Sequence, residues 1–145
     1  MFSTTTEYAL RALALLAQLP EDEAILGREL AERADIPANY LSKILWTLGG
    51  AGIIDATRGS GGGYRLRRKA GDVRLAEVVE LFEKGKAKLS CLLSSDRMCS
   101  DQNPCSAHGA WREVRAAFIN FLQSTTVADI SRPGRPVGTQ GARFE

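Results

Sequence analysis

Residues 37–66 read PANYLSKILWTLGGAGIIDATRGSGGGYRL, and this stretch decides the fold. Its first part repeats large apolar residues at the spacing i, i+3, i+4 and i+7: Leu41, Ile44, Leu45 and Leu48. This spacing is typical of a helix with one buried face. The helix is expected to open near Pro37, where proline suits the first helical position, and to end at the glycines after Leu48.

The second part of the stretch predicts a β-hairpin. Residues 53–57 form a short β-like run, and the glycine-rich residues 58–63 suit a tight, flexible turn. Residues 64–67 alternate between apolar and polar side chains, as expected of a return strand.

Two more helices are predicted before this stretch. The first covers residues 5–19, with capping-box spacing between Thr4 and Glu7 at its start and Pro20 as its stop. The second covers residues 26–34 and is joined to the next helix by a tight connection. Short helices followed by a hairpin form a winged helix-turn-helix layout. The expected fold class is therefore mainly α with a small β-hairpin wing.

The remainder of the chain is predicted to form a different unit. A fourth helix is expected over residues 75–82, a polar loop over 85–104, and a long amphipathic helix over about 105–123. One side of the long helix is apolar: Trp111, Val114, Phe118, Phe121 and Leu122. A single helix on a small domain cannot bury such a stripe alone, so a second copy of the chain is the expected cover.

Composition sets wide limits on the class of protein. The chain has 145 residues, 44% hydrophobic and 25% charged, which is ordinary for a soluble globular protein. No apolar run approaches the roughly 18 residues of a membrane-spanning helix. The N-terminus has no basic region or cleavage site of a secretory signal, so a cytoplasmic location is expected. Because the net charge is only +2, the distribution of charge must show whether nucleic acid is a partner.

Positive charge is concentrated in and after the predicted hairpin. Between Asp55 and Asp72 the chain has no acidic residue and five basic ones: Arg58, Arg65, Arg67, Arg68 and Lys69. A glycine tip flanked by arginines can follow a DNA backbone or enter a minor groove, whereas the alternative is a merely solvated hairpin.

The helix before the hairpin presents polar residues in its N-terminal half, the half with which recognition helices contact base edges. The predicted DNA-binding residues are Arg28, Asn39, Tyr40, Ser42, Lys43, Arg58, Gly59, Ser60, Gly61 and Arg65. For Tyr40 the alternative is packing against the first helix.

All three cysteines and the single histidine lie within 18 residues, with the spacing C-x7-C-x5-C-x2-H: Cys91, Cys99, Cys105 and His108. An odd number of cysteines is a poor disulfide framework, and in a reducing cytosol such cysteines favour metal binding or catalysis. Thiolates spread along a loop suit an iron–sulfur cluster, either 2Fe-2S or 4Fe-4S.

Three other interpretations of the cysteines stay open. The first is a zinc-stabilised or thiol-switch DNA-binding module, although the C-x2-C pairs usual in zinc ribbons are missing. The second is a thiol redox enzyme, which the sequence disfavours because it lacks a C-x2-C pair, so no enzymatic activity is expected. The third is three unrelated loop cysteines, which the preference of cysteine for burial disfavours.

Several motifs resemble the bacterial winged-helix regulators typified by IscR and NsrR, with RirA and CymR as relatives. The resemblance covers about residues 2–130 in six motifs: EYALRAL at 7–13, IPxxYLxKILxxL at 36–48, AGII at 51–54, RGxxGGYxL at 58–66, VRLAEVV at 73–79 and CxxHxxW at 105–111. It implies a homodimeric repressor or activator that binds a pseudo-palindromic operator in double-stranded DNA. It also implies an iron–sulfur cluster on Cys91, Cys99 and Cys105 that senses redox state, nitric oxide or the supply of iron or clusters.

Two residues compete for the fourth ligand of that cluster. In the IscR-like branch the fourth ligand resembles His108, three residues after the last cysteine. In the NsrR-like branch it is an acidic residue in the first helix of the partner subunit, a place that Glu7 occupies here. Both residues also have ordinary structural interpretations, Glu7 as a capping-box residue and His108 as a surface residue at a helix N-terminus. The gap of seven residues between Cys91 and Cys99 is longer than is typical of the IscR-like branch.

The expected domains follow from these assignments. Residues 1–70 are the winged helix-turn-helix DNA-binding domain. Residues 71–130 are the cluster-binding loop and the dimerisation helix, with one more helical turn at 127–130. Residues 131–145, rich in proline, glycine and arginine, are expected to be a flexible tail.

Overall fold

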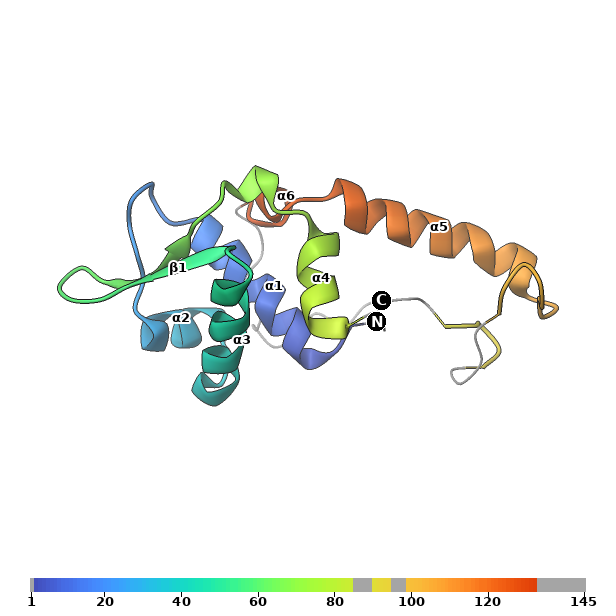
Figure 1. The fold of residues 1–145 in the computed structure, drawn as a ribbon, viewed down its shortest axis with the longest axis horizontal. Coiled ribbons are helices and arrows are strands. Elements are labelled where there is room, and N and C mark those ends of the chain that lie inside the picture. The colour runs from blue at the N-terminus through green and yellow to red at the C-terminus, as the bar shows by residue number, and fades with distance from the viewer. Residues whose placement is uncertain (1, 85–89, 95–98, 133–145) are drawn as a thin grey trace, which may run out of the picture.

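The computed structural model describes residues 2–84, 90–94 and 99–132. The elements in chain order are α1 (Thr4–Ala17), α2 (Gly27–Ala34), α3 (Ala38–Gly50), β1 (Ile54–Thr57), β2 (Gly63–Leu66), the 3-10 turn η1 (Ala70–Asp72), α4 (Leu75–Glu83), α5 (His108–Ser124) and α6 (Val127–Ile130). Figure 1 shows α1 to α4, α6 and the hairpin gathered into one body, here called the head, and the long helix α5, here called the arm, which extends away from it.

The head is organised around one apolar core. Leu13 of α1, Leu30 of α2, Leu48 of α3 and Val78 of α4 are each 0% exposed. The whole apolar stripe predicted for α3 is buried in this core, as its spacing indicated. Val127 of α6 is also fully buried, so the chain returns to the head after α5.

The start of α1 differs from the predicted capping box. The N-cap is Ser3, whose Oγ accepts a hydrogen bond from the N–H of Thr6, and Thr4 is already helical. The carboxylate that a capping box would supply comes from Glu83 at the end of α4, which accepts from the N–H of Ser3 at 2.7 Å and from Oγ1 of the buried Thr6 at 2.6 Å. Glu7 is exposed, and its side chain has no hydrogen-bond partner among the described residues. The predicted capping box of Thr4 and Glu7 is therefore wrong, because Glu83 of α4 accepts the hydrogen bonds at the N-terminus of α1.

The turn between α2 and α3 has the geometry of a helix-turn-helix connection. Asp35 ends α2 in the left-handed region, with φ of 53°. The N–H of Ile36 donates to the carbonyl of Ala31 at 2.9 Å, which closes the C-terminus of α2. Pro37 is the N-cap of α3 and not its first residue, so the helix begins one position later than expected.

The hairpin forms as predicted and is tied to the rest of the head. β1 and β2 are antiparallel, with Thr57 opposite Gly63. The next residue of β2, Tyr64, exchanges backbone hydrogen bonds of 3.0 and 2.8 Å with Ile25, which precedes α2. Gly63 has φ of 141°, and a Cβ there would lie 2.3 Å from the carbonyl oxygen of Ile25. Glycine is therefore required where the wing leaves the head.

The C-terminal half of α5 anchors the arm to the head. α5 begins at His108, later than the expected start near Cys105. Leu122 is buried in the head core, and the ring of Phe118 lies 5.7 Å from that of Phe2. Other apolar side chains of α5 stay about half exposed: Val114 at 49%, Ile119 at 47% and Phe121 at 48%.

The remaining expectations concern the loop and the tail. Within the predicted loop, residues 90–94 and 99–104 form short turns, while 85–89 and 95–98 lie outside the described residues. The expected single turn at 127–130 is α6. Residues 133–145 of the expected tail also lie outside the described residues. None of the described helices is both long enough and apolar enough to span a membrane.

Candidate metal centre and nucleic-acid interface

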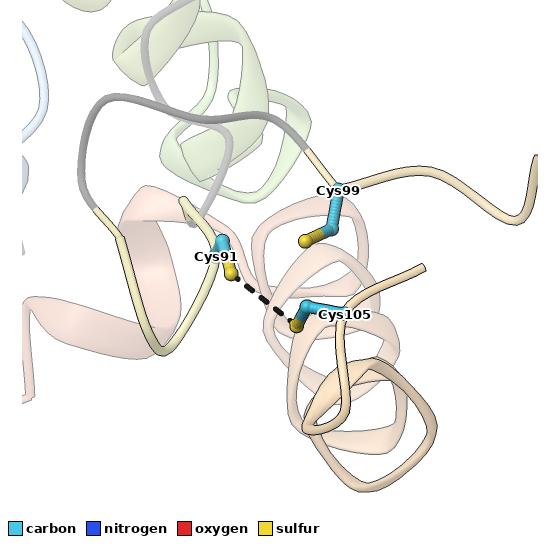
Figure 2. Close-up of side chains that lie close together, drawn as sticks. All are labelled: Cys91, Cys99 and Cys105. Carbon is cyan, nitrogen blue, oxygen red and sulfur yellow. Dashed lines mark hydrogen bonds between the residues drawn. The ribbon is translucent and has the colours of Figure 1, made fainter. Parts of the chain in front are cut away.

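Three cysteine sulfurs converge beside the start of α5. Cys91 is buried at the first position of a turn that ends at Ser94, while Cys99 and Cys105 are half-buried. The three Sγ atoms all lie within 4.8 Å of one another, and those of Cys91 and Cys105 are 3.5 Å apart (Figure 2). All three cysteines are free thiols. The centre lies at the end of the arm that points away from the head (Figure 1).

Hydrogen bonds between the sulfurs shift the pKa values of two of the thiols in opposite directions. Hydrogen bonds with Cys91 and then with Cys105 raise the pKa of Cys99 to about 11. The same bond with Cys99 lowers the pKa of Cys91, because it stabilises that sulfur as a thiolate. Three neighbouring thiolates repel one another, and a bound metal cation would offset that repulsion as it displaces their protons.

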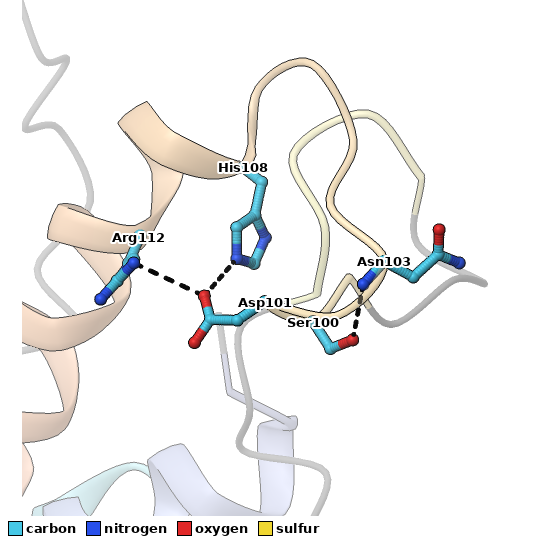
Figure 3. Close-up of polar contacts among 5 residues, drawn as sticks. All are labelled: Ser100, Asp101, Asn103, His108 and Arg112. Carbon is cyan, nitrogen blue, oxygen red and sulfur yellow. Dashed lines mark hydrogen bonds and ion pairs between the residues drawn. The ribbon is translucent and has the colours of Figure 1, made fainter.

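His108 is the first residue of α5, and its backbone N–H donates to the carbonyl oxygen of Cys105 at 3.1 Å. Its Nε2 is 3.0 Å from Oδ1 of Asp101, and Arg112 reaches the same oxygen at 3.5 Å (Figure 3). The hydrogen bond from His108, and then the charge of Arg112, hold the pKa of Asp101 below its usual range. An ionised carboxylate only accepts hydrogen bonds, so Nε2 carries the proton. The other nitrogen, Nδ1, is buried and has no partner among the described residues.

Of the five residues expected to bind metal, the described structure brings together the three cysteines. The nitrogens of His108 are outside the group of sulfurs, although His108 follows Cys105 closely in the chain. Glu7 lies on α1 in the head, also outside that group. The ligand sets with His108 or with Glu7 of the partner subunit therefore stay predictions.

The sequence analysis did not predict the hydrogen bonds that two supporting residues of the centre make. Asp101 orients His108, but an acidic residue in a polar loop is unremarkable on its own. Trp111 donates its indole N–H to the carbonyl oxygen of Ser90 at 2.7 Å, which ties the turn that carries Cys91 to α5. The CxxHxxW motif contained Trp111, yet this bond depends on a loop that sequence patterns do not place.

The predicted recognition helix exposes its polar face. Asn39, Ser42 and Lys43 are exposed, on the side of α3 opposite the buried stripe. Tyr40 is 47% exposed, and its ring meets that of Tyr8 on α1 edge to face, with centroids 5.8 Å apart. Tyr40 therefore packs on α1, as the alternative interpretation expected, and its contact with DNA stays a prediction.

The wing carries less free charge than its sequence indicated. Ion pairs engage three of its five cations: Arg65 with Asp22 and Arg67 with Asp55, each at 3.9 Å, and Arg68 with Glu77. Arg58, at the exposed tip with Gly59, Ser60 and Gly61, has no ion-pair partner within the described ranges. Arg28 is exposed on α2. Exposed ion pairs contribute little, so Arg65 can exchange Asp22 for a phosphate.

Comparisons with known proteins give the same account of the fold. The Rrf2 family, described as an iron-dependent transcriptional regulator, matches residues 2–133. An HTH-type transcriptional regulator NsrR of Geobacillus kaustophilus is 33% identical over 125 residues, which cover 86% of this chain and 85% of that protein. Among solved structures, CymR, the global cysteine regulator of B. subtilis, has a TM-score of 0.74 at 23% identity and covers 90% of this chain and 95% of its own.

A second solved structure, T. potens IscR, has a TM-score of 0.67 at 25% identity, over 90% of this chain and 85% of that one. These likenesses and the observed elements confirm the expected winged-helix class, mainly α with a two-stranded wing. The family and the relatives are transcriptional regulators and not enzymes, in agreement with the sequence.

Proposed function

We propose, because the chain belongs to the Rrf2 family of transcriptional regulators, that it is a homodimeric DNA-binding regulator controlled by an iron–sulfur cluster on its three cysteines. One observation carries this proposal: the sulfurs of Cys91, Cys99 and Cys105, separated in the sequence, gather within 4.8 Å of one another. The description of the family as iron-dependent supports iron over other metals. Redox state, nitric oxide or the supply of iron or clusters would be the signal.

The donor set fits a cluster of this kind. Iron–sulfur clusters are held by cysteine thiolates, with histidine as an occasional substitute. Two of the thiols are half-buried, so small oxidants reach them, whereas Cys91 is buried and gives the site a protected side. When bound, the cluster supplies iron that reacts with oxygen or nitric oxide.

His108 is the better supported fourth ligand. The bond from Nε2 to Asp101 leaves a lone pair on Nδ1, and that atom is buried without a partner among the described residues. An unpaired buried nitrogen costs free energy unless something binds it, and metal-ligating histidines commonly hold a carboxylate with their other nitrogen. Glu7 of the partner subunit remains the competing ligand, because this residue is exposed on α1 and is free of side-chain hydrogen bonds among the described residues.

The sulfur spacing favours a second candidate, a zinc-stabilised or thiol-switch regulator. Around one tetrahedral zinc ion with Zn–S bonds of about 2.3 Å, sulfurs lie about 3.8 Å apart. The 3.5 Å between the sulfurs of Cys91 and Cys105 is near that value, and it is also short enough for oxidation to a disulfide after a small movement. The distinguishing measurement is therefore the identity of the metal.

The arm offers a route from the cysteines to DNA. Val114 and Phe121 share one face of α5 and are about half exposed, and a second copy of the chain would cover them. At its other end α5 buries Leu122 in the head, so a shift of α5 would move the head. In a dimer such a shift changes the spacing of the two recognition helices and hence the affinity for an operator with two half-sites.

The cluster proposal is tested by anaerobic purification followed by absorption spectroscopy, native mass spectrometry and assays for iron, sulfide and zinc. Wild-type protein is expected to be brown or red, with iron and acid-labile sulfide. Cys91→Ser, Cys99→Ser and Cys105→Ser should each lose most of both, while Ser106→Ala, an exposed neighbour of Cys105, should keep them. Colourless wild-type protein with one zinc per chain would overturn the cluster in favour of the second candidate.

Variants of the fourth ligand are compared in the same preparations. His108→Ala is expected to alter the visible and resonance Raman spectra of the iron, and Glu7→Ala to leave them unchanged. The reverse result would assign the ligand to Glu7 of the partner subunit. If both variants keep the wild-type spectrum, neither residue is the ligand.

The DNA interface is tested separately by the salt dependence of binding to duplexes selected from a random library. Arg58→Ala and Lys43→Ala should weaken binding, and each phosphate that a variant no longer neutralises should reduce the salt slope by about one. Arg132→Ala, an exposed arginine after α6, is the matched control and should bind as wild type does. Unchanged binding in both Arg58→Ala and Lys43→Ala would show that the head docks in another way.

A further inference from the structure

The largest exposed aromatic side chain of the head lies on α3. Trp46 is 82% exposed, whereas Leu45 beside it is 4% exposed and Leu48 is fully buried. The other tryptophan, Trp111, donates its N–H to a backbone carbonyl within the chain. Trp46 has no such bond among the described residues, so both its apolar surface and its indole N–H are available to a partner.

The position of Trp46 places it in line with the polar face of α3. Asn39, Ser42, Lys43 and Trp46 follow the spacing i, i+3, i+4 and i+7, and all are exposed. Recognition helices that lie in the major groove contact bases with residues at this spacing. Seven residues of helix span about 10 Å, so Trp46 marks the far end of a row about as long as the groove is wide.

We propose that Trp46 reads DNA sequence by packing its indole ring against the C5-methyl group of a thymine in each half-site. The thymine methyl is the one apolar group that a base pair presents in the major groove. The other residues of the row, Asn39, Ser42 and Lys43, are polar and suit the hydrogen-bonding atoms of the base edges instead. Indole is a donor through its N–H only, so it cannot accept a hydrogen bond from adenine or cytosine. This inference rests on the proposed docking of α3 and is independent of the metal.

Binding-site selection from a randomised duplex, with wild type and Trp46→Ala, tests the inference. The wild-type consensus should contain a thymine position in each half-site that the variant no longer prefers. A mismatch at one such position is expected to weaken wild-type binding by between about five-fold and a hundred-fold. An equal weakening on all sequences, with the same consensus, would overturn base reading in favour of binding to the DNA backbone.

Duplexes with deoxyuridine in place of thymidine isolate the methyl group. At the selected position the substitution should weaken wild-type binding by about four-fold, the value of one buried methyl group, and leave Trp46→Ala unaffected. Wild-type indifference to deoxyuridine at every thymine of the site would contradict the inference. Because Trp46 is almost fully exposed, Trp46→Ala should unfold at the wild-type temperature, which circular dichroism checks.

Two further variants separate this inference from the docking of α3. If Lys43→Ala and Trp46→Ala both leave binding unchanged, α3 does not enter the groove and the proposed interface fails. If Lys43→Ala weakens binding and Trp46→Ala does not, only the role of Trp46 fails. The change in tryptophan emission when the selected duplex binds should be larger in wild type than in Trp46→Ala, and equal changes in the two proteins would overturn the contact.

Discussion

In the head, side chains from four helices exclude water from a shared core, whereas along the arm α5 buries only His108 and Leu122. One of those two, Leu122, belongs to the core of the head. Leu13, Leu30 and Leu48, by contrast, come from three different helices and are each 0% exposed. The head completes its apolar core within one chain, and the arm does not.

This difference shows which interactions each region needs. Each fully buried leucine stabilises the head by about 1.5–3 kcal/mol relative to an exposed one. In the described part of the cysteine-bearing turns the buried apolar residue is Cys91, so this region lacks a core of its own, and the proposed metal and second chain would stabilise it. Regions with few buried apolar contacts open most easily, which suits a sensor.

The largest expected effect comes from placing a charge on the uncovered face of α5. Phe121→Asp should dissociate the proposed dimer, because a buried unpaired carboxylate costs several kcal/mol. Sedimentation equilibrium measures the change in association. Asn120→Asp adds a charge at the adjacent exposed position and should leave association near wild type. A Phe121→Asp protein that sediments as a wild-type dimer would mean that this face is not the interface.

The core of the head should respond strongly within each chain. Leu48→Ala should lower the free energy of unfolding by about 2–5 kcal/mol, because it removes buried methyl groups and leaves a cavity. Urea unfolding followed by circular dichroism measures this decrease. The neighbouring Thr47→Ala, at a half-exposed position, should change stability by no more than about 0.5 kcal/mol. Equal effects of the two substitutions would contradict a core completed by α3.

A smaller effect is expected where α1 meets α4. Thr6→Val keeps the shape of the side chain but removes the donor to Glu83, so stability should fall by about 1–2 kcal/mol at pH 7. The hydrogen bond from Thr6 lowers the pKa of Glu83 from its ordinary value near 4.5. The stabilisation is therefore present above the unfolded pKa and is lost as the pH falls through the lower folded pKa.

Unfolding measured between pH 7 and pH 3 checks the sign of this effect. The wild type should lose more stability on acidification than Thr6→Val, and the two should converge at low pH. Thr5→Val, in the same first turn, serves as the control and should follow the wild-type pH dependence. If stability falls with pH equally in wild type and Thr6→Val, the hydrogen bond from Thr6 does not stabilise the Glu83 carboxylate.

Local sequence patterns predicted the head well where the signal lies within a short segment, such as the apolar repeat of α3 or the glycine-rich turn of the wing. The stripe of α3 and the pairing of the wing strands depend on neighbours at most a few residues away, and both formed within about one residue of the prediction. The predicted capping box failed because Glu83 lies 80 residues from Ser3 and is brought there only by the packing of α4 against α1.

The sequence by itself determined the buried face of α3, the wing and the set of three cysteines, because periodicity and clustering are properties of the chain as written. Tertiary structure alone decided that the cysteine sulfurs meet, that Asp101 binds Nε2 of His108, and that Asp22 pairs with Arg65. Such contacts depend on where loops return in space. Hydrogen bonds and ion pairs act over a few ångströms, so the packing of whole helices determines which polar groups come within reach of one another.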